Sequence, residues 1–225
     1  MISFSQEKVV TKMKCDKKAM LVYAVTDRSW VGKQTLMEQV EDCLKGGATC
    51  VQLREKELDD AGFLQEAIEM QTLCRQYAVP FIVNDNVDIA IACKADGIHV
   101  GQKDMEASCV REKVGPDMIL GVSVRSVEQA VLAEKNGADY LGVGAVFTTS
   151  TKLDADFVEY KTLKAICDAV SIPVVAIGGI TKENLMQLAG SGIDGVAVVS
   201  AIFAADDICK ATEELYALSS EMICR

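Results

Sequence analysis

A short basic segment, QLREK at positions 52–56, follows one of the apolar runs of the chain. Gln52, Arg54 and Lys56 are spaced two residues apart, and side chains of an extended chain alternate with period two, so we expect all three to point the same way. Two cations and an amide on one side can hold phosphate oxygens through charge-assisted hydrogen bonds. A solvated charged loop is the alternative, and the segment alone does not separate the two.

Two carboxylates follow two further apolar runs. Asp85 comes directly after the run at 80–84, and Asp104 comes shortly after the run at 97–101. Mg²⁺ takes one or two carboxylates, keeps several waters and shares substrate phosphate oxygens, so this pair predicts a Mg²⁺ site. Each aspartate taken singly could instead cap a helix.

A run of hydroxyl side chains, Thr148 to Thr151, precedes Lys152 and follows the apolar run at 140–144. Gly179 directly follows another run, and Ser200 ends the last one. Glycine allows the backbone to approach a ligand closely, so these positions predict a second, uncharged anion site made of backbone amides. The hydroxyl run and Lys152 could contact both sites.

Several kinds of chemistry are disfavoured. The single histidine, His99, lies inside an apolar run, so no Ser–His pair with Ser123 and no hydrolytic triad is expected. The nine cysteines form no CxxC pair and lie at no ligand spacing from His99, which argues against zinc. Scattered cysteines in odd number indicate reduced thiols and a cytoplasmic protein.

The charge balance also limits the partners. Lys and Arg number 23 against 33 Asp and Glu, for a net charge of −10. Nucleic acids and anionic membranes attract a cationic surface, so neither is expected as a partner.

Residues 1–19 carry no apolar signal segment and are expected to form an N-terminal extension before a barrel domain at 20–225. The oligomeric state is not set by the sequence, and a homo-oligomer stays open.

Eight short apolar runs alternate with helical patterns along the chain. The runs lie at 21–26, 49–53, 80–84, 97–101, 118–124, 140–144, 173–178 and 195–200. The helical patterns lie at 33–45, 59–77, 86–94, 105–114, 126–136, 158–170, 181–190 and 206–220. Runs without a polar face predict parallel strands buried on both sides. We therefore expect a single (β/α)8 TIM barrel, whose strand ends gather the polar groups above at one mouth. An open doubly wound sheet is less favoured, because no GxGxxG follows the first run.

Seven motifs, spread from about residue 23 to 203, resemble those of the thiamine-phosphate synthase (thiamine-phosphate pyrophosphorylase) family. They are QLREK, NDNVDIA, ADGIHVGQKD, GVSV, GVGAVFTTSTK, VVAIGGI and GVAVVSAI, in the family's order and spacing. The resemblance implies a Mg²⁺-dependent transferase of thiamine biosynthesis. It joins 4-amino-2-methyl-5-(diphosphooxymethyl)pyrimidine to 4-methyl-5-(2-phosphoethyl)thiazole and releases pyrophosphate.

The resemblance also implies roles for individual residues. The pyrimidine diphosphate would be bound by Gln52, Leu53, Arg54, Glu55, Lys56, Asn84, Ser123 and Lys152. The thiazole phosphate would be bound by Thr149, Ser150, Thr151, Gly179, Val199 and Ser200. Asp85 and Asp104 would hold Mg²⁺, and Arg54, Lys56 and Lys152 would be the catalytic cations.

The chain departs from the family pattern in two places. Thr148 stands where the family often has proline, which leaves the resting conformation of that loop open. Val124 and Arg125 follow Ser123 where the family often has a small residue and a histidine, which bears on the lining of the pyrimidine pocket.

Three other functions are weighed against the synthase. A thiazole tautomerase-type barrel would not need the diphosphate cluster, and a non-catalytic phosphate-binding protein would not need both carboxylates. A phosphosugar isomerase or aldolase would need a basic Glu or a Schiff-base Lys inside a strand, and no run carries one clearly.

Overall fold

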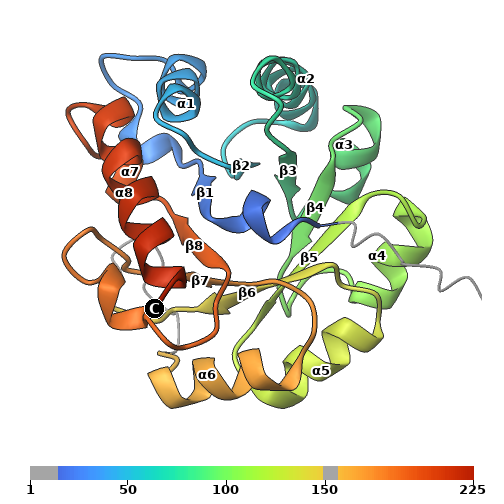
Figure 1. Cartoon of the computed structure of the whole chain (residues 1–225). Coiled ribbons are helices and arrows are strands. Elements are labelled where there is room, and N and C mark those ends of the chain that lie inside the picture. Colours follow the sequence, from blue (N-terminus) through green and yellow to red (C-terminus); the bar gives the residue numbers. More distant parts are fainter. Residues whose placement is uncertain (1–14, 149–156) are drawn as a thin grey trace, which may run out of the picture.

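Eight parallel strands close into one barrel in this computed structural model, which describes residues 15–148 and 157–225 (Figure 1). The strands are β1 (Val22–Val25), β2 (Cys50–Leu53), β3 (Phe81–Asn84), β4 (Gly97–Val100), β5 (Ile119–Val124), β6 (Tyr140–Gly144), β7 (Val174–Ile177) and β8 (Gly195–Val198). Each strand pairs with the next, and β8 pairs with β1, which closes the ring. The predicted (β/α)8 TIM barrel is thus confirmed.

Helices surround the barrel and cover its outer face (Figure 1). They are α1 (Leu36–Lys45), α2 (Asp60–Gln76), α3 (Val87–Ala92), α4 (Ala107–Val114), α5 (Val127–Lys135), α6 (Tyr160–Ala169), α7 (Ser200–Phe203) and α8 (Ile208–Ile223), with 3₁₀ turns η1 (Lys17–Met20), η2 (Arg28–Trp30) and η3 (Leu185–Leu188). None of the helices in the described ranges is both long enough and apolar enough to span a membrane.

The core has two layers, because successive strand residues face opposite sides of the sheet. Side chains such as Val51, Val83 and Leu141 face outward and pack under the helices. Side chains such as Tyr23 and Tyr140 face inward and fill the barrel. A strand buried on both faces needs apolar residues at nearly every position, which is why the runs lacked a polar face.

One end of the barrel is closed by the chain that leads into β1. Met20, at the end of η1, and Cys15 are buried against the inward-facing side chains. Asp16 caps η1 by accepting a hydrogen bond from the backbone amide of Lys18 at 2.9 Å. Residues 15–19 of the predicted extension thus cover the floor of the barrel, at the end away from the polar strand ends.

The two elements that follow β7 in the chain differ from their predictions. The expected helix at 181–190 is only the 3₁₀ turn η3, in which Leu185 and Leu188 are buried. A spacing of three residues suits a 3₁₀ helix and an α-helix equally, so the apolar pattern did not distinguish them. The last strand ends at Val198 rather than at 200, because Ser200 begins the short helix α7.

Replacing Gly121 by alanine is expected to destabilise the barrel by about 1–3 kcal/mol. A Cβ at this position would lie 2.1 Å from Cζ of the Tyr140 ring, which is fully buried and cannot move aside. Urea unfolding of the Gly121→Ala variant measures the loss. Gly32→Ala is the matched control, because a Cβ there meets nothing within 4 Å. Equal stability of the two variants would contradict the packing described here.

Candidate functional site

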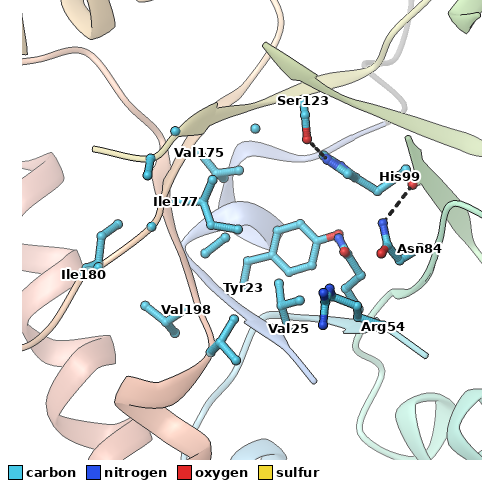
Figure 2. A pocket seen from close by; sticks show the side chains of 18 of the residues that line it. Tyr23, Val25, Arg54, Asn84, His99, Ser123, Val175, Ile177, Ile180 and Val198 are labelled. Carbon is cyan, nitrogen blue, oxygen red and sulfur yellow. Dashed lines mark hydrogen bonds between the residues drawn. The ribbon is translucent and has the colours of Figure 1, made fainter. Parts of the chain in front are cut away.

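A cavity opens at the C-terminal ends of the strands (Figure 2). Its lining comes from all eight strands and from residues up to three positions after a strand: Tyr23, Val25, Gln52, Arg54, Asn84, His99, Ser123, Arg125, Gly142, Gly144, Ala145, Val175, Ile177, Gly178, Gly179, Ile180, Ala197, Val198, Val199 and Ser200. In Figure 2 apolar side chains of β7 and β8 lie opposite the polar side chains of β2 to β5. One wall can therefore pack against a ring while the other makes polar contacts.

Arg54 lies at the end of β2 and lines the cavity (Figure 2). Its backbone amide donates to Oγ1 of Thr26 at 3.0 Å, and its guanidinium donates to Oδ2 of Asp27 at 2.7 Å. Asp27 engages only one guanidinium nitrogen in this ion pair, so other N–H groups of Arg54 stay available to an anion. Gln52, two residues earlier, lines the same cavity.

Lys56 and Asp85 form an ion pair at the rim, with Nζ 2.6 Å from Oδ2. Asn84 lines the cavity and donates from Nδ2 to the other carboxylate oxygen of Asp85 at 2.8 Å. The backbone of Asp85 has φ +63°, a left-handed conformation that aspartate and asparagine tolerate better than most residues. The turn after β3 thus directs this carboxylate toward the rim that Lys56 occupies.

Asp104 lies close to Asp85. One of its carboxylate oxygens accepts a hydrogen bond from the backbone amide of Gly101 at 2.7 Å. Burial raises the pKa of Asp104, and the neighbouring Asp85 raises it further, against the lowering effect of the Gly101 amide. Two carboxylates that disfavour each other's charge are the arrangement that a shared cation relieves.

The two carboxylates at this rim, Asp85 and Asp104, suit a Mg²⁺ ion that also binds substrate and water. They are too few for a metal ion whose ligands all come from protein side chains. Within residues 15–148 and 157–225, no group of three or more His, Cys, Asp or Glu side chains is placed to hold a metal ion. Mg²⁺ needs only one or two carboxylates when substrate phosphate and water complete its ligands. Asp85 and Asp104 supply that number.

Leu53 and Glu55 belong to the basic segment at 52–56, but neither side chain lines the cavity. Leu53 is buried in the outer core layer under the helices. The Glu55 side chain is 1% exposed and accepts hydrogen bonds from its own loop at the backbone amides of Glu57 and Leu58, and from Arg28 at 2.5 Å. Both residues hold the loop in place, and any contact with a substrate would be through their backbone.

Glu55 should make the protein sensitive to acid. Burial alone would raise its pKa, but the amides of Glu57 and Leu58 and the charge of Arg28 outweigh burial and lower the pKa from 4.5 to about 2. Its contribution to stability, about 3 kcal/mol, is present above about pH 4.5 and is lost as the pH falls toward 2.

The test compares the free energy of unfolding of the wild type and Glu55→Gln across that range. The wild type is expected to lose about 3 kcal/mol more than the variant between pH 4.5 and pH 2. Parallel pH profiles would show that Glu55 does not carry this stability.

Two segments form an uncharged part of the cavity wall. Gly178 and Gly179, after β7, have φ values of +100° and +65°, and Ser200 begins α7 after β8. The backbone amides of Gly179 and Ser200 donate to no other described residue, so both can donate a hydrogen bond to an anion. A Cβ on Gly179 would lie 2.3 Å from the carbonyl oxygen of Thr148, which explains the need for glycine there.

The segment after β6 reaches this same part of the wall. The backbone amide of Phe147 donates to the carbonyl oxygen of Gly178 at 3.0 Å, and Thr148 lies against Gly179. Four predicted ligands, Thr149, Ser150, Thr151 and Lys152, lie outside the described residues. Val124 and Arg125, which depart from the family pattern after Ser123, lie in different places. Val124 is buried under the helices, whereas Arg125 lines the cavity.

Three ring residues inside the barrel are part of the site and were not predicted. Tyr23 and His99 line the cavity, and Tyr140 lies directly beneath them. Hydrogen bonds connect them to Gln52 at one end and to Ser123 at the other. Figure 2 shows the bond between His99 and Ser123. The available signal was that these residues occupy inward positions of three different strands.

The expectation that His99 forms no pair with Ser123 is wrong, because both side chains face into the barrel from the neighbouring strands β4 and β5, and Nε2 of His99 lies 2.8 Å from Oγ of Ser123. The other ring nitrogen bonds the Tyr140 hydroxyl at 2.9 Å rather than a carboxylate, so these contacts do not make a hydrolytic triad.

Comparisons with known proteins agree with this geometry. The family model described as thiamine monophosphate synthase matches residues 22–202. Thiamine-phosphate synthase of Ruminiclostridium cellulolyticum is 53% identical over 194 residues, which cover 86% of this chain and 92% of that protein. Thiamine-phosphate synthase of Clostridium beijerinckii is 50% identical over 194 residues and covers 86% of this chain and 93% of its own length.

A solved structure gives the same result. Thiamine phosphate pyrophosphorylase from Pyrococcus furiosus superposes with a TM-score of 0.85 at 40% sequence identity. The match covers 92% of this chain and 98% of that one. The similarity therefore extends over the whole barrel and includes every strand end that contributes to the cavity.

Proposed function

The chain belongs to the thiamine monophosphate synthase family, and from this premise we propose how its cavity carries out the reaction. The enzyme is a transferase that joins the pyrimidine diphosphate to the thiazole phosphate, forming thiamine phosphate and pyrophosphate. The single observation that carries the assignment of the site is that Arg54 and the Gly178–Gly179 turn line one cavity, with the Asp85 and Asp104 carboxylates at its rim.

The cationic side of the cavity is suited to the leaving group. Breaking the CH₂–O bond leaves negative charge on pyrophosphate, and Arg54 and Lys56 would stabilise that charge where water is partly excluded. Lys152, by the family resemblance, would add a third cation. Bound Mg²⁺, held by Asp85 and Asp104, would neutralise part of the charge on the diphosphate.

The uncharged side is suited to the second substrate. The amides of Gly179 and Ser200 would donate hydrogen bonds to the phosphate of the thiazole without adding a full charge next to the cationic side. The thiazole nitrogen then attacks the methylene carbon, whose positive charge the aminopyrimidine ring delocalises. This attack needs no protein base, so the contribution of the chain is to hold the two rings in position.

The rival functions are less favoured at this site. A thiazole tautomerase-type barrel would use the amide side alone, and a phosphate-binding protein would not need both carboxylates. Arg54, Lys56, Asp85 and Asp104 all gather on the other side, and they are the residues that a diphosphate leaving group requires.

The test is release of pyrophosphate by the purified full chain. Release should need the pyrimidine diphosphate, the thiazole phosphate and Mg²⁺ together, and a chelator should abolish it until Mg²⁺ is restored. Pyrophosphate release that is independent of the thiazole would indicate a hydrolase, and no release with all three present would refute the proposal.

A further inference from the structure

Five polar side chains form a continuous line of hydrogen bonds across the barrel. Gln52 Nε2 lies 2.7 Å from the Tyr23 hydroxyl, which lies 2.7 Å from the Tyr140 hydroxyl. The Tyr140 hydroxyl lies 2.9 Å from Nδ1 of His99, and Nε2 of His99 lies 2.8 Å from Oγ of Ser123. The two ends, Gln52 and Ser123, line the cavity, and the two tyrosines are buried. We call these five residues the polar line.

Each hydroxyl in the polar line has a single proton, so the direction of the first bond fixes the direction of the rest. Gln52 Nε2 can only donate, and therefore Tyr23 accepts from it. The thiol of Cys50 also lies next to the Tyr23 hydroxyl, but sulfur is a weak acceptor, so Tyr23 gives its own proton to the Tyr140 hydroxyl at 2.7 Å. Tyr140 then gives its proton to Nδ1 of His99. An imidazole that accepts at Nδ1 carries its proton at Nε2, so His99 donates to Ser123.

We propose that this order of protons makes the polar line a specificity device. Ser123 Oγ already accepts from His99, so its own proton is left to donate into the cavity. Gln52 uses its amide nitrogen on Tyr23, so its carbonyl oxygen is left to accept from the cavity. The free protein thus presents one donor and one acceptor on fixed strands, and Tyr23, Tyr140 and His99 are the positioning residues that set which is which.

This pattern selects a class of ring, and that part of the inference rests on the proposed function. A 4-aminopyrimidine offers a ring nitrogen that accepts and an exocyclic amino group that donates. A 4-oxopyrimidine offers the reverse, a ring N–H that donates and a carbonyl oxygen that accepts. Its N–H would lie against the Ser123 donor, and its carbonyl oxygen would lie against the Gln52 acceptor. An unsatisfied buried polar group costs enough to reject such an analogue strongly.

The order of protons can be observed directly, since His99 is the single histidine of the chain. In ¹⁵N-histidine-labelled protein at mildly alkaline pH, the spectrum should show one neutral ring with the proton on Nε2. A ring protonated on Nδ1 would overturn the proposal, because the whole line would then run the other way. This measurement needs no substrate, so its result does not depend on the proposed function.

Kinetics test the consequence for specificity. Tyr140→Phe keeps the ring and removes the central hydroxyl, so the KM for the aminopyrimidine diphosphate should rise by about tenfold to a hundredfold. The KM for the thiazole phosphate should stay unchanged, and the preference for the 4-amino over the 4-oxo analogue should shrink by a similar factor. Tyr23→Phe, which breaks the line one bond further from His99, should do the same.

Tyr77→Phe is the matched control. Its hydroxyl donates to Glu41 on α1, outside the barrel, and no change in either KM is expected. If Tyr140→Phe and Tyr23→Phe keep the full preference for the amino ring, the polar line has no part in specificity. If pyrophosphate release fails in the wild type while His99 carries its proton on Nε2, the proposed function fails and the polar line stands.

Discussion

Asp85→Asn should lower the Mg²⁺-dependent rate on the order of a hundredfold to a thousandfold at saturating substrates. The change removes a carboxylate charge while keeping the size of the side chain. Asparagine is a better replacement than alanine here, because the backbone has φ +63°, which asparagine adopts at a lower cost than alanine. Steady-state pyrophosphate release, measured over a wide range of Mg²⁺ concentration, gives the result.

Two controls separate the metal from the ion pair. Lys56→Gln breaks the contact with Asp85 but leaves the carboxylate, so its Mg²⁺ requirement should not rise as that of Asp85→Asn does. Asp88→Asn, three residues further along, changes an exposed carboxylate paired with Lys113 and should leave the rate unchanged. A near-normal rate of Asp85→Asn at ordinary Mg²⁺ would remove Asp85 from the metal site.

Arg54→Gln should lower kcat on the order of a hundredfold. The guanidinium is fixed by Asp27 at the cavity wall, and its remaining N–H groups are available to the leaving pyrophosphate. Because that charge develops only as the bond breaks, the loss should appear mainly in kcat and less in the KM for the thiazole phosphate.

The matched control for Arg54→Gln is Arg75→Gln on α2. Arg75 is exposed and lies outside the residues that line the cavity, and the same loss of charge there should have no effect. Arg54→Lys should recover little activity, since an ammonium cannot hold Asp27 and phosphate oxygens in the same planar arrangement. An unchanged kcat in Arg54→Gln would exclude the arginine from leaving-group stabilisation.

The strands of this barrel were predictable because they are buried on both faces. That requirement produces an apolar run at nearly every strand, and all eight runs correspond to strands of the structure. The positions after the runs were also informative, because parallel strands bring their carboxyl ends to one rim. Arg54 and Gly179 were found in this way, and both line the cavity. Asn84 and Ser123, which the family resemblance implied, line it as well.

Other features depend on contacts that a sequence does not display. The residues next to Glu55 in the chain do not indicate its partner. The Glu55 carboxylate pairs with Arg28, 27 residues earlier, and therefore does not line the cavity. Tyr23, His99 and Tyr140 meet only when the sheet closes, since they come from β1, β4 and β6. A linear pattern shows that each faces inward, but not that their polar atoms come within hydrogen-bonding distance of one another.

Gly121 and Tyr140 sit at the same level of neighbouring strands, and the ring of one fills the space above the other. A substitution at one of the two positions therefore constrains which residues the other position can accept. A relative that gains a larger residue at the first position must lose the aromatic ring at the second, and with it the hydroxyl that connects two sides of the barrel. We expect aligned relatives to inherit the two residues as a pair.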